Sequence, residues 1–537
     1  MLKKPNLFLL SLLSILLLSL SWYWHLSILI FFAFVPLLII ENKLFSSAEI
    51  NKPKLKLIAY SYLIFLSWNI GVTWWVQYAS LEGAIAAFLM NALLMTIVFV
   101  FYSTLKSKLK KWWGVWLLIP TWIAFEHIHT IWDMSWTWLT LGNVFAFNHN
   151  WIQWYEYTGT SGGTLWILAT NILIFEIVKN NSAKKIISKP ILKIASLIIV
   201  PILISYLILF VSFNKAGHKD GYNCVIVQPN IDPYNDKFNS DYQSQFLKAM
   251  FLIRGKINSG TNYLILPETF ITDNLIEEGI SETEPVKWFK DSLLSKFPNL
   301  TIIAGCNSYK FYRDKKEITS TSRKDEESGL HYDVFNSAIQ INSNTIQVYH
   351  KSKLVPGVER MPFPALLKPL ESLAINLGGT FGSLGIDGKR SVFTSQADKV
   401  KIAPVICYES VYADYVTEYM RLGANIIFII TNDGWWQNTP GYKQHLNYAR
   451  LRAIENRKQI VRCANTGTSC FIDEFGNTYQ ETNWWEPAVI EQKIYLNNSL
   501  TFFSRFGDMI SYLSIVMSVL LVIWRLVLIF KPKNNLN

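Results

Sequence analysis

Eight long apolar stretches constrain the fold of this chain more than any other feature of its sequence. A helix needs about 20 mainly apolar residues to cross a bilayer core of about 30 Å, and several of the stretches reach this length. The 51% hydrophobic and 17% charged composition is typical of a membrane protein. We therefore predict an α-helical transmembrane bundle of about eight spans. The stretches are residues 7–24, 26–40, 57–77, 83–103, 112–131, 164–178, 193–213 and 508–530.

Cationic residues gather in every second loop between these stretches. The intervening loops, near residues 22–27, 78–82 and 132–163, contain no lysine or arginine. Because cytoplasmic loops are enriched in positive charge, the alternation predicts that both termini are cytoplasmic and that segment 214–507 lies on the outer side. The number of these cations exceeds the net charge of the whole chain, +11, so the remainder of the chain has no excess of positive charge. The basic composition therefore reflects membrane topology and argues against nucleic-acid binding. They are Lys3, Lys4, Lys43, Lys52, Lys54, Lys56, Lys106, Lys108, Lys110, Lys111, Lys179, Lys184, Lys185, Lys189, Lys193, Arg525, Lys531 and Lys533.

The outer segment alternates short apolar runs with helical patterns, which predicts a layered α/β domain. The domain organisation is then a seven-span bundle at 1–213, an outer catalytic domain at 214–507 and a final span with its tail at 508–537. Predicted strands are 224–228, 263–267, 300–305, 334–342, 344–350, 400–408, 424–433 and 459–467; predicted helices are 240–257, 283–296, 411–422 and 442–456.

Three reactive or charged residues follow predicted strands: Glu268 after YLILP, Lys351 after NTIQVYH, and Cys407 after VKIAPVI. Each alone has an ordinary explanation, as a helix-start carboxylate, a surface cation or a packed thiol. Ligands bind at the carboxyl ends of strands in open α/β sheets, so three such positions in one domain favour a site. The thiol would be the nucleophile, Glu268 its general base, and Lys351 the cation stabilising a tetrahedral intermediate. Lys353 is the close alternative to Lys351, and the main-chain N–H of Tyr408 is a further expected donor.

The motifs LPETF, YHKSKLVPGVE and VICYES, in this order, resemble the Glu–Lys–Cys set of the nitrilase (carbon–nitrogen hydrolase) superfamily. With spans on both sides of this domain, the whole chain resembles the apolipoprotein N-acyltransferase family of bacterial inner membranes. The resemblance implies an α-β-β-α sandwich. It also implies that Glu359 helps to hold the site and that Tyr408, Glu409 and Trp435 flank it.

The resemblance further implies a two-step acyl transfer without a cofactor. A phospholipid would donate an acyl chain to Cys407, and the α-amine of a diacylglyceryl-modified apolipoprotein would accept it, in a monomeric enzyme of the inner membrane. The same three residues could instead serve a membrane-tethered amidase or nitrilase. From a different class, the bundle could be a transporter with a degenerate outer domain. The apolar, glycine-rich stretch 354–386 is expected to be either a mobile lid or buried core.

Two further groups of residues have competing interpretations. Glu126, His127 and His129 close one apolar stretch, where they could form a proton relay, a metal site or an interfacial polar cap. The five cysteines contain no CxxC pair, so neither a disulfide framework nor a zinc site is expected, and at least one thiol is free.

Overall fold

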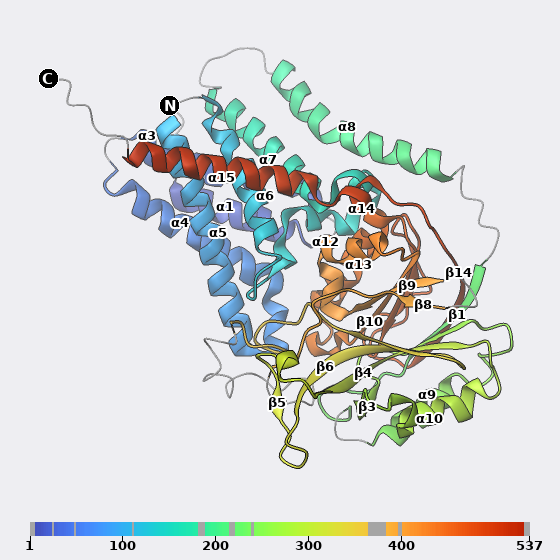
Figure 1. Cartoon of the computed structure of the whole chain (residues 1–537). Coiled ribbons are helices and arrows are strands. Elements are labelled where there is room, and N and C mark those ends of the chain that lie inside the picture. Colours follow the sequence, from blue (N-terminus) through green and yellow to red (C-terminus); the bar gives the residue numbers. More distant parts are fainter. Residues whose placement is uncertain are drawn as a thin grey trace. The chain divides into compact units, whose positions relative to one another are not determined.

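The computed structural model describes residues 6–23, 26–47, 50–109, 112–180, 188–213, 221–237, 241–363, 383–395 and 400–530. The chain divides into two compact units, coloured by sequence in Figure 1. The membrane unit comprises Met1–Trp74, Ala84–Val211 and Phe506–Asn537, and the α/β unit comprises Trp75–Gly83 and Ser212–Arg505. Part of the predicted lid (364–382) and several of the cationic positions lie outside the described residues: Lys3, Lys4, Lys110, Lys111, Lys184, Lys185, Lys531 and Lys533.

Six helical stretches among the described residues are long and apolar enough to cross a membrane: Ser27–Ser46, Pro53–Tyr78, Leu81–Leu109, Tyr155–Asn180, Lys189–Ser212 and Met509–Val527. Their main elements are α2 (Ile30–Ala33), α3 (Val35–Ser46), α4 (Pro53–Thr73), α5 (Leu81–Leu109), α7 (Tyr155–Asn180), α8 (Ser188–Phe213) and α15 (Met509–Phe530). The expected helical transmembrane region is therefore confirmed.

The other two predicted spans fold as shorter helices. Helix α1 (Leu7–Leu20) has 14 residues, which corresponds to about 21 Å at 1.5 Å per residue. The stretch 112–131 begins as a 3₁₀ helix, Trp112–Leu117, and continues as the 11-residue helix α6 (Leu118–Ile128). Pro120 lies in the first turn of α6, the part of a helix where a missing N–H is tolerated. Among the described residues the span count is thus six by length and composition, and α1 and α6 are too short to be included.

Buried polar side chains join the helices of the membrane unit. The amide of Asn171 on α7 accepts from the main-chain N–H of Phe34 (2.8 Å) and donates to the carbonyl oxygen of Ile30 (2.9 Å). Glu41 on α3 accepts from the hydroxyl of Ser103 (2.9 Å) and is paired with Lys106, both on α5. Such contacts satisfy polar groups where lipid offers no hydrogen-bond partner.

Two sheets form the centre of the α/β unit. The eight-stranded sheet has the order β14-β1-β2-β4-β6-β5, with β3 on β4 and β7 on β6. Its strands are β1 (Gly221–Gln228), β2 (Tyr263–Ile265), β3 (Ile271–Ile276), β4 (Thr301–Tyr312), β5 (Arg323–Lys324), β6 (His331–Ile341), β7 (Ile346–His350) and β14 (Ala488–Tyr495). The six-stranded sheet contains β8 (Phe393–Thr394), β9 (Lys401–Ile406), β10 (Ile426–Thr431), β11 (Ile460–Ala464), β12 (Cys470–Ile472) and β13 (Thr478–Tyr479).

The sheets pack face to face between two helical layers, as the predicted α-β-β-α sandwich requires. Tyr263 of β2 meets Phe428 of β10 edge to face, with ring centroids 5.7 Å apart. Helices α9 (Tyr242–Leu252) and α10 (Glu284–Phe289) lie along one sheet, and α12 (Ala413–Arg421) and α13 (Pro440–Asn456) along the other (Figure 1). The apolar core under α9 and α10 includes Phe246 and Phe289, both essentially buried. This packing of apolar faces positions the loops at the strand ends.

The segment Trp75–Gly83, which follows α4 in sequence, belongs to the α/β unit. The indole of Trp75 contacts the Trp436 ring at 5.0 Å, edge to face. A Cβ added to Gly441 would lie 2.6 Å from the Trp75 ring, so α13 approaches this indole more closely than a larger residue would permit. Tyr234 donates from its hydroxyl to the carbonyl oxygen of Tyr78 (3.2 Å).

Candidate active site

Glu268 and Lys351 form the centre of a buried, charged cluster. The Lys351 ammonium lies 2.9 Å from Oε1 of Glu268 and 2.8 Å from Oε1 of Glu359. The amide of Asn336 on β6 donates to the same two oxygens, at 2.8 and 3.0 Å. Two loops that follow β2 and β7 are thereby joined. One cation and one amide serve two carboxylates, which is the pairing that buried charges require.

Opposing influences set the protonation of this cluster. Burial raises the pKa of Glu268, but the Lys351 charge and the hydrogen bonds from Lys351 and Asn336 outweigh it, leaving that pKa below its usual value. Burial lowers the pKa of Lys351, and the Glu268 and Glu359 carboxylates more than reverse this, so it lies well above the usual range. At neutral pH the cluster therefore holds a carboxylate at Glu268 and an ammonium at Lys351.

Cys407 occupies a strained turn between β9 and a short 3₁₀ helix, Cys407–Val411. Its φ of 49° lies in the left-handed region, which is uncommon for a residue with a side chain and clusters at functional sites. The side chain is buried, at 8% exposure. The hydroxyl of Ser410 holds the turn by donating to the carbonyl oxygen of Cys407 (2.7 Å).

The charges of Glu268 and Lys351 both act on the Cys407 thiol. Burial and the Glu268 carboxylate raise the pKa of Cys407, while the Lys351 ammonium and a hydrogen bond with the Thr431 side chain lower it. The net direction is upward, so the resting side chain is a thiol. A reaction at this sulfur would therefore require a base to remove its proton.

Glu409 ties the Cys407 turn to the segment that carries Lys351. It is fully buried and accepts from the main-chain N–H of Ile406 (2.8 Å) and of Ser352 (2.7 Å). It also accepts from the hydroxyls of Tyr349 (2.7 Å) and Tyr415 (2.8 Å). Glu409 thus connects the residue before Cys407 with the residue after Lys351.

The remaining sequence-predicted residues contact other side chains, mainly tyrosines. Tyr408 is buried, with its ring edge to face with Tyr412 at 5.2 Å. Trp435 is half-buried; its carbonyl oxygen accepts from the Tyr234 hydroxyl (2.7 Å) and its ring meets Tyr234 at 5.3 Å. The ammonium of Lys353, the alternative to Lys351, lies 4.9 Å from the Tyr412 ring.

Sequence reasoning missed a fully buried ionic network beneath Cys407. Asp433 accepts from Arg462 (2.6 Å) and lies 2.9 Å from Nδ1 of His445. Nε2 of His445 lies 3.1 Å from the carbonyl oxygen of Cys407 and 2.9 Å from the Ser410 hydroxyl. Although the sequence offers no histidine near Cys407, the fold brings one to its main chain. Arg462 within the otherwise apolar strand β11 was the available signal.

Gly305 on β4 allows the Glu268 loop to approach the sheet. A Cβ at Gly305 would lie 2.4 Å from the main-chain nitrogen of Thr269 and 2.6 Å from Cα of Glu268. Gly305→Ala is therefore expected to displace this loop and to destabilise the fold by about 1–3 kcal/mol. Thermal unfolding measures the loss of stability. Gly388→Ala is the matched control, since a Cβ there meets nothing within 4 Å; equal behaviour of the two variants would contradict this account.

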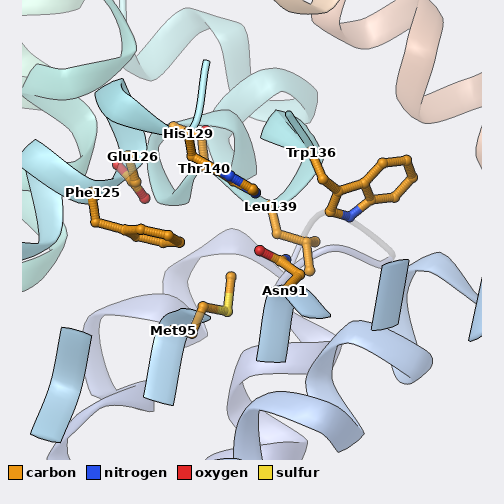
Figure 2. A pocket seen from close by; sticks show the side chains of 8 residues that line it. All are labelled: Asn91, Met95, Phe125, Glu126, His129, Trp136, Leu139 and Thr140. Carbon is orange, nitrogen blue, oxygen red and sulfur yellow. The ribbon is translucent and has the colours of Figure 1, made fainter. Parts of the chain in front are cut away.

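The cluster predicted around Glu126 lies within the membrane unit. Glu126 accepts from the Trp122 indole (3.1 Å), the Thr164 hydroxyl (2.7 Å) and the main-chain N–H of Leu141 (2.8 Å). His127 lies 4.0 Å from Asp508, and His129 lines a pocket (Figure 2). Within the described ranges, no three His, Cys, Asp or Glu side chains are grouped as metal ligands would be. The contacts of Glu126 are those of a structural anchor.

The sandwich fold and the buried cluster define a class, and comparison with known proteins agrees. The family model described as carbon–nitrogen hydrolase matches residues 225–499, more than half of the chain, which therefore belongs to that family. A second model, described as the apolipoprotein N-acyltransferase N-terminal domain, matches residues 14–173. Within the hydrolase family, the chain is a member of the apolipoprotein N-acyltransferase group. It is accordingly an enzyme of this superfamily and a multi-pass membrane protein.

Similar proteins extend along nearly the whole chain. The apolipoprotein N-acyltransferase of Chlorobaculum tepidum is 28% identical over 526 residues, covering 95% of each chain. That of Rickettsia typhi is 28% identical over 414 residues, covering 76% of each. Among solved structures, Nit3 of Saccharomyces cerevisiae, a nitrilase-superfamily member, is 16% identical and covers 52% of this chain and 91% of its own, with a TM-score of 0.37.

Proposed function

We propose that this enzyme transfers an acyl chain from a membrane phospholipid to the α-amine of an S-diacylglyceryl-cysteine at the N-terminus of a lipoprotein. One arrangement carries the chemistry: Glu409 ties the strained turn of Cys407 to the segment whose Lys351 forms a buried carboxylate–ammonium pair with Glu268. The membrane unit and the names of the relatives support lipid and lipoprotein as substrates.

In the first step, the Cys407 sulfur attacks the ester carbonyl carbon of the phospholipid while its proton passes to Glu268. Lys351 and the main-chain N–H of Tyr408 stabilise the oxyanion that forms. The ester C–O bond then breaks, and Glu268 returns the proton to the leaving alcohol. A lysophospholipid departs, and the acyl group remains on Cys407 as a thioester.

In the second step, the lipoprotein amine attacks the thioester carbon and gives a proton to Glu268. The C–S bond breaks as the amide forms, and the Cys407 sulfur recovers the proton. Glu359, Asn336 and Glu409 hold the reacting groups in place without taking part in bond formation. Every proton that leaves one group in the proposed cycle is accepted by another, and neither acyl-transfer step uses a cofactor.

The orientation proposed for the chain follows from its charges. We place the catalytic domain, 214–507, on the outer side of the membrane, with both termini in the cytoplasm. The bacterial inner membrane and the monomeric state are proposed from the family resemblance. The alternation of lysine-rich and lysine-free loops supports this orientation.

The fate of the acyl group tests the proposed function. Purified full-length protein in lipid nanodiscs is incubated with acyl-labelled phospholipid and a synthetic S-diacylglyceryl-cysteinyl peptide. The expected product is the N-acylated peptide, with lysophospholipid in equal amount. Label released only as free fatty acid would indicate a hydrolase and overturn the proposal. Normal function in cells that carry Cys407→Ala would instead favour the transporter.

A further inference from the structure

Lys237 is a second buried lysine beside Glu268, and the predicted Glu–Lys–Cys set does not include it. Its side chain is 1% exposed, and its ammonium donates to the main-chain carbonyl oxygen of Glu268 at 2.8 Å. Its own main chain is anchored on both sides, by its N–H on the carbonyl oxygen of Asp232 (2.9 Å) and by the Gln245 amide on its carbonyl oxygen (2.7 Å). The ammonium is therefore held in one position.

Two charge-bearing groups from separate parts of the fold act on this ammonium. Glu268 lies in the loop after β2 and Cys407 in the turn after β9, and a negative charge on either raises the pKa of Lys237. Within the described part of the chain, the neighbouring cluster has two carboxylates, Glu268 and Glu359, and one ammonium that pairs with them, that of Lys351. A charged Lys237 would balance the two carboxylates, and it would oppose the negative charge that develops on sulfur or oxygen during the reaction.

Resting on the proposed function, we propose that Lys237 is a positioning residue for the Cys407 reaction. It fixes the main chain that carries Glu268 and supplies a second positive charge to the site. Burial lowers the pKa of Lys237 to about 8, although Glu268 and Cys407 act in the opposite direction. The Lys237 ammonium is thus charged below about pH 8 and neutral above it, so the rate of the Cys407 reaction should depend on pH in this range.

The test is the pH profile of Cys407 acylation by labelled phospholipid in full-length protein. The wild type is expected to lose rate above about pH 8. Lys237→Arg should move this loss to higher pH because a guanidinium keeps its charge. Lys237→Met should remove the dependence and lower the rate at pH 7 by about 10- to 100-fold, the range for one lost charged hydrogen bond.

Two controls separate the possible failures. Thermal unfolding identifies a variant that does not fold. If Lys237→Met does not fold, the pH profile of Lys237→Arg tests the role of Lys237. Wild-type rates and profiles in both variants would overturn the role of Lys237 while leaving acyl transfer intact. If the wild type forms no thioester at all, the proposed function fails and the Lys237 role falls with it.

A separate observation concerns the small pocket of the membrane unit shown in Figure 2, which has room for about one water-sized group. The indole N–H of Trp132 donates to Nδ1 of His129 (2.7 Å), so the neutral ring carries its proton on Nε2. The amide of Asn91 donates to Oδ1 of Asn69 (2.7 Å), which leaves Oδ1 of Asn91 as an acceptor. Nε2 and this Oδ1 are buried, and neither has a hydrogen-bond partner among the described residues.

We infer that this pocket binds a hydroxyl group. His129 and Asn91 are 5% and 2% exposed, and Figure 2 shows them on opposite sides of the pocket. His129 offers a donor and Asn91 an acceptor, so one group that both accepts and donates would satisfy both buried polar atoms, which are costly to leave unpaired. A water molecule and a lipid alcohol share this chemistry. Met95, Phe125 and Leu139 also line the pocket, so a lipid that inserts its hydroxyl would place the adjoining carbon atom beside apolar side chains.

A structure of the full-length protein in lipid nanodiscs, at a resolution that shows ordered water, tests this inference. Density is expected within about 3.2 Å of both His129 Nε2 and Asn91 Oδ1, the usual hydrogen-bond limit. An isolated peak identifies water, and density continuous with a lipid identifies a lipid alcohol. Asn91→Leu should remove the peak. An empty pocket, or one filled only by an acyl chain, would overturn the inference.

Discussion

Cys407→Ala is expected to abolish acyl transfer, with a loss on the order of 10⁴-fold or more, as for nucleophiles that act as part of a catalytic unit. The reason is that the proposed thioester cannot form without the sulfur. Labelling with acyl-labelled phospholipid and assay of the acylated peptide measure the two half-reactions separately. The fold should survive, because only one small side chain is shortened.

The matched control for this variant is Cys470→Ala, which alters another buried thiol of the same unit. It should retain acyl transfer within a few fold. If Cys407→Ala were as active as Cys470→Ala, another residue would have to be the nucleophile, and the mechanism would be wrong.

Lys351→Met should have the second largest effect because it removes both activity and stability. Its loss removes the cation that pairs with the buried carboxylate of Glu268 and the partly buried carboxylate of Glu359, and breaking a buried pair such as the first costs about 3–5 kcal/mol. The rate of acyl-enzyme formation should also fall about 10³-fold, as when one oxyanion-stabilising group is lost. Single-turnover labelling and thermal unfolding measure these two effects.

Two further variants separate activity from stability. Adding Glu359→Gln to Lys351→Met removes one unpaired carboxylate, so part of the stability should return without the rate. Lys353→Met changes a lysine that lies over the Tyr412 ring, and its rate should stay within about threefold of wild type, as for an exposed cation–π contact. A larger loss in Lys353→Met than in Lys351→Met would reverse the assignment of the cation.

Apolar pattern and strand-end position predicted most of the α/β unit. The buried strands β9 and β10 are continuous apolar runs, and both were found within one or two residues of their ends. Strand β14, which pairs antiparallel with β1 and forms an edge of its sheet, was missed. Its AVIEQKIY sequence is half-exposed and carries charges, so it lacks the apolar signal of a buried strand.

The residues missed at the site depend on tertiary contacts. Lys237 lies in a polar loop that reads as solvated, and only the fold buries its ammonium against Glu268. His445 belongs to α13, nearly 40 residues after Cys407, and meets it only through packing of that helix. The alternation of cationic loops with loops that lack lysine and arginine is visible in the sequence. The lengths of the helices are not, because the apolar stretch 112–131 contains an α-helix, α6, of only 11 residues.

Mapping of the acyl-enzyme tests the central claim most directly. Full-length protein is incubated with acyl-labelled phospholipid without acceptor, quenched in acid, digested and analysed by mass spectrometry. We expect the acyl mass on the peptide containing Cys407, released by neutral hydroxylamine and chased to product by the S-diacylglyceryl-cysteinyl peptide. Label on a different residue, or acylated product formed while Cys407 stays unmodified throughout, would contradict the account.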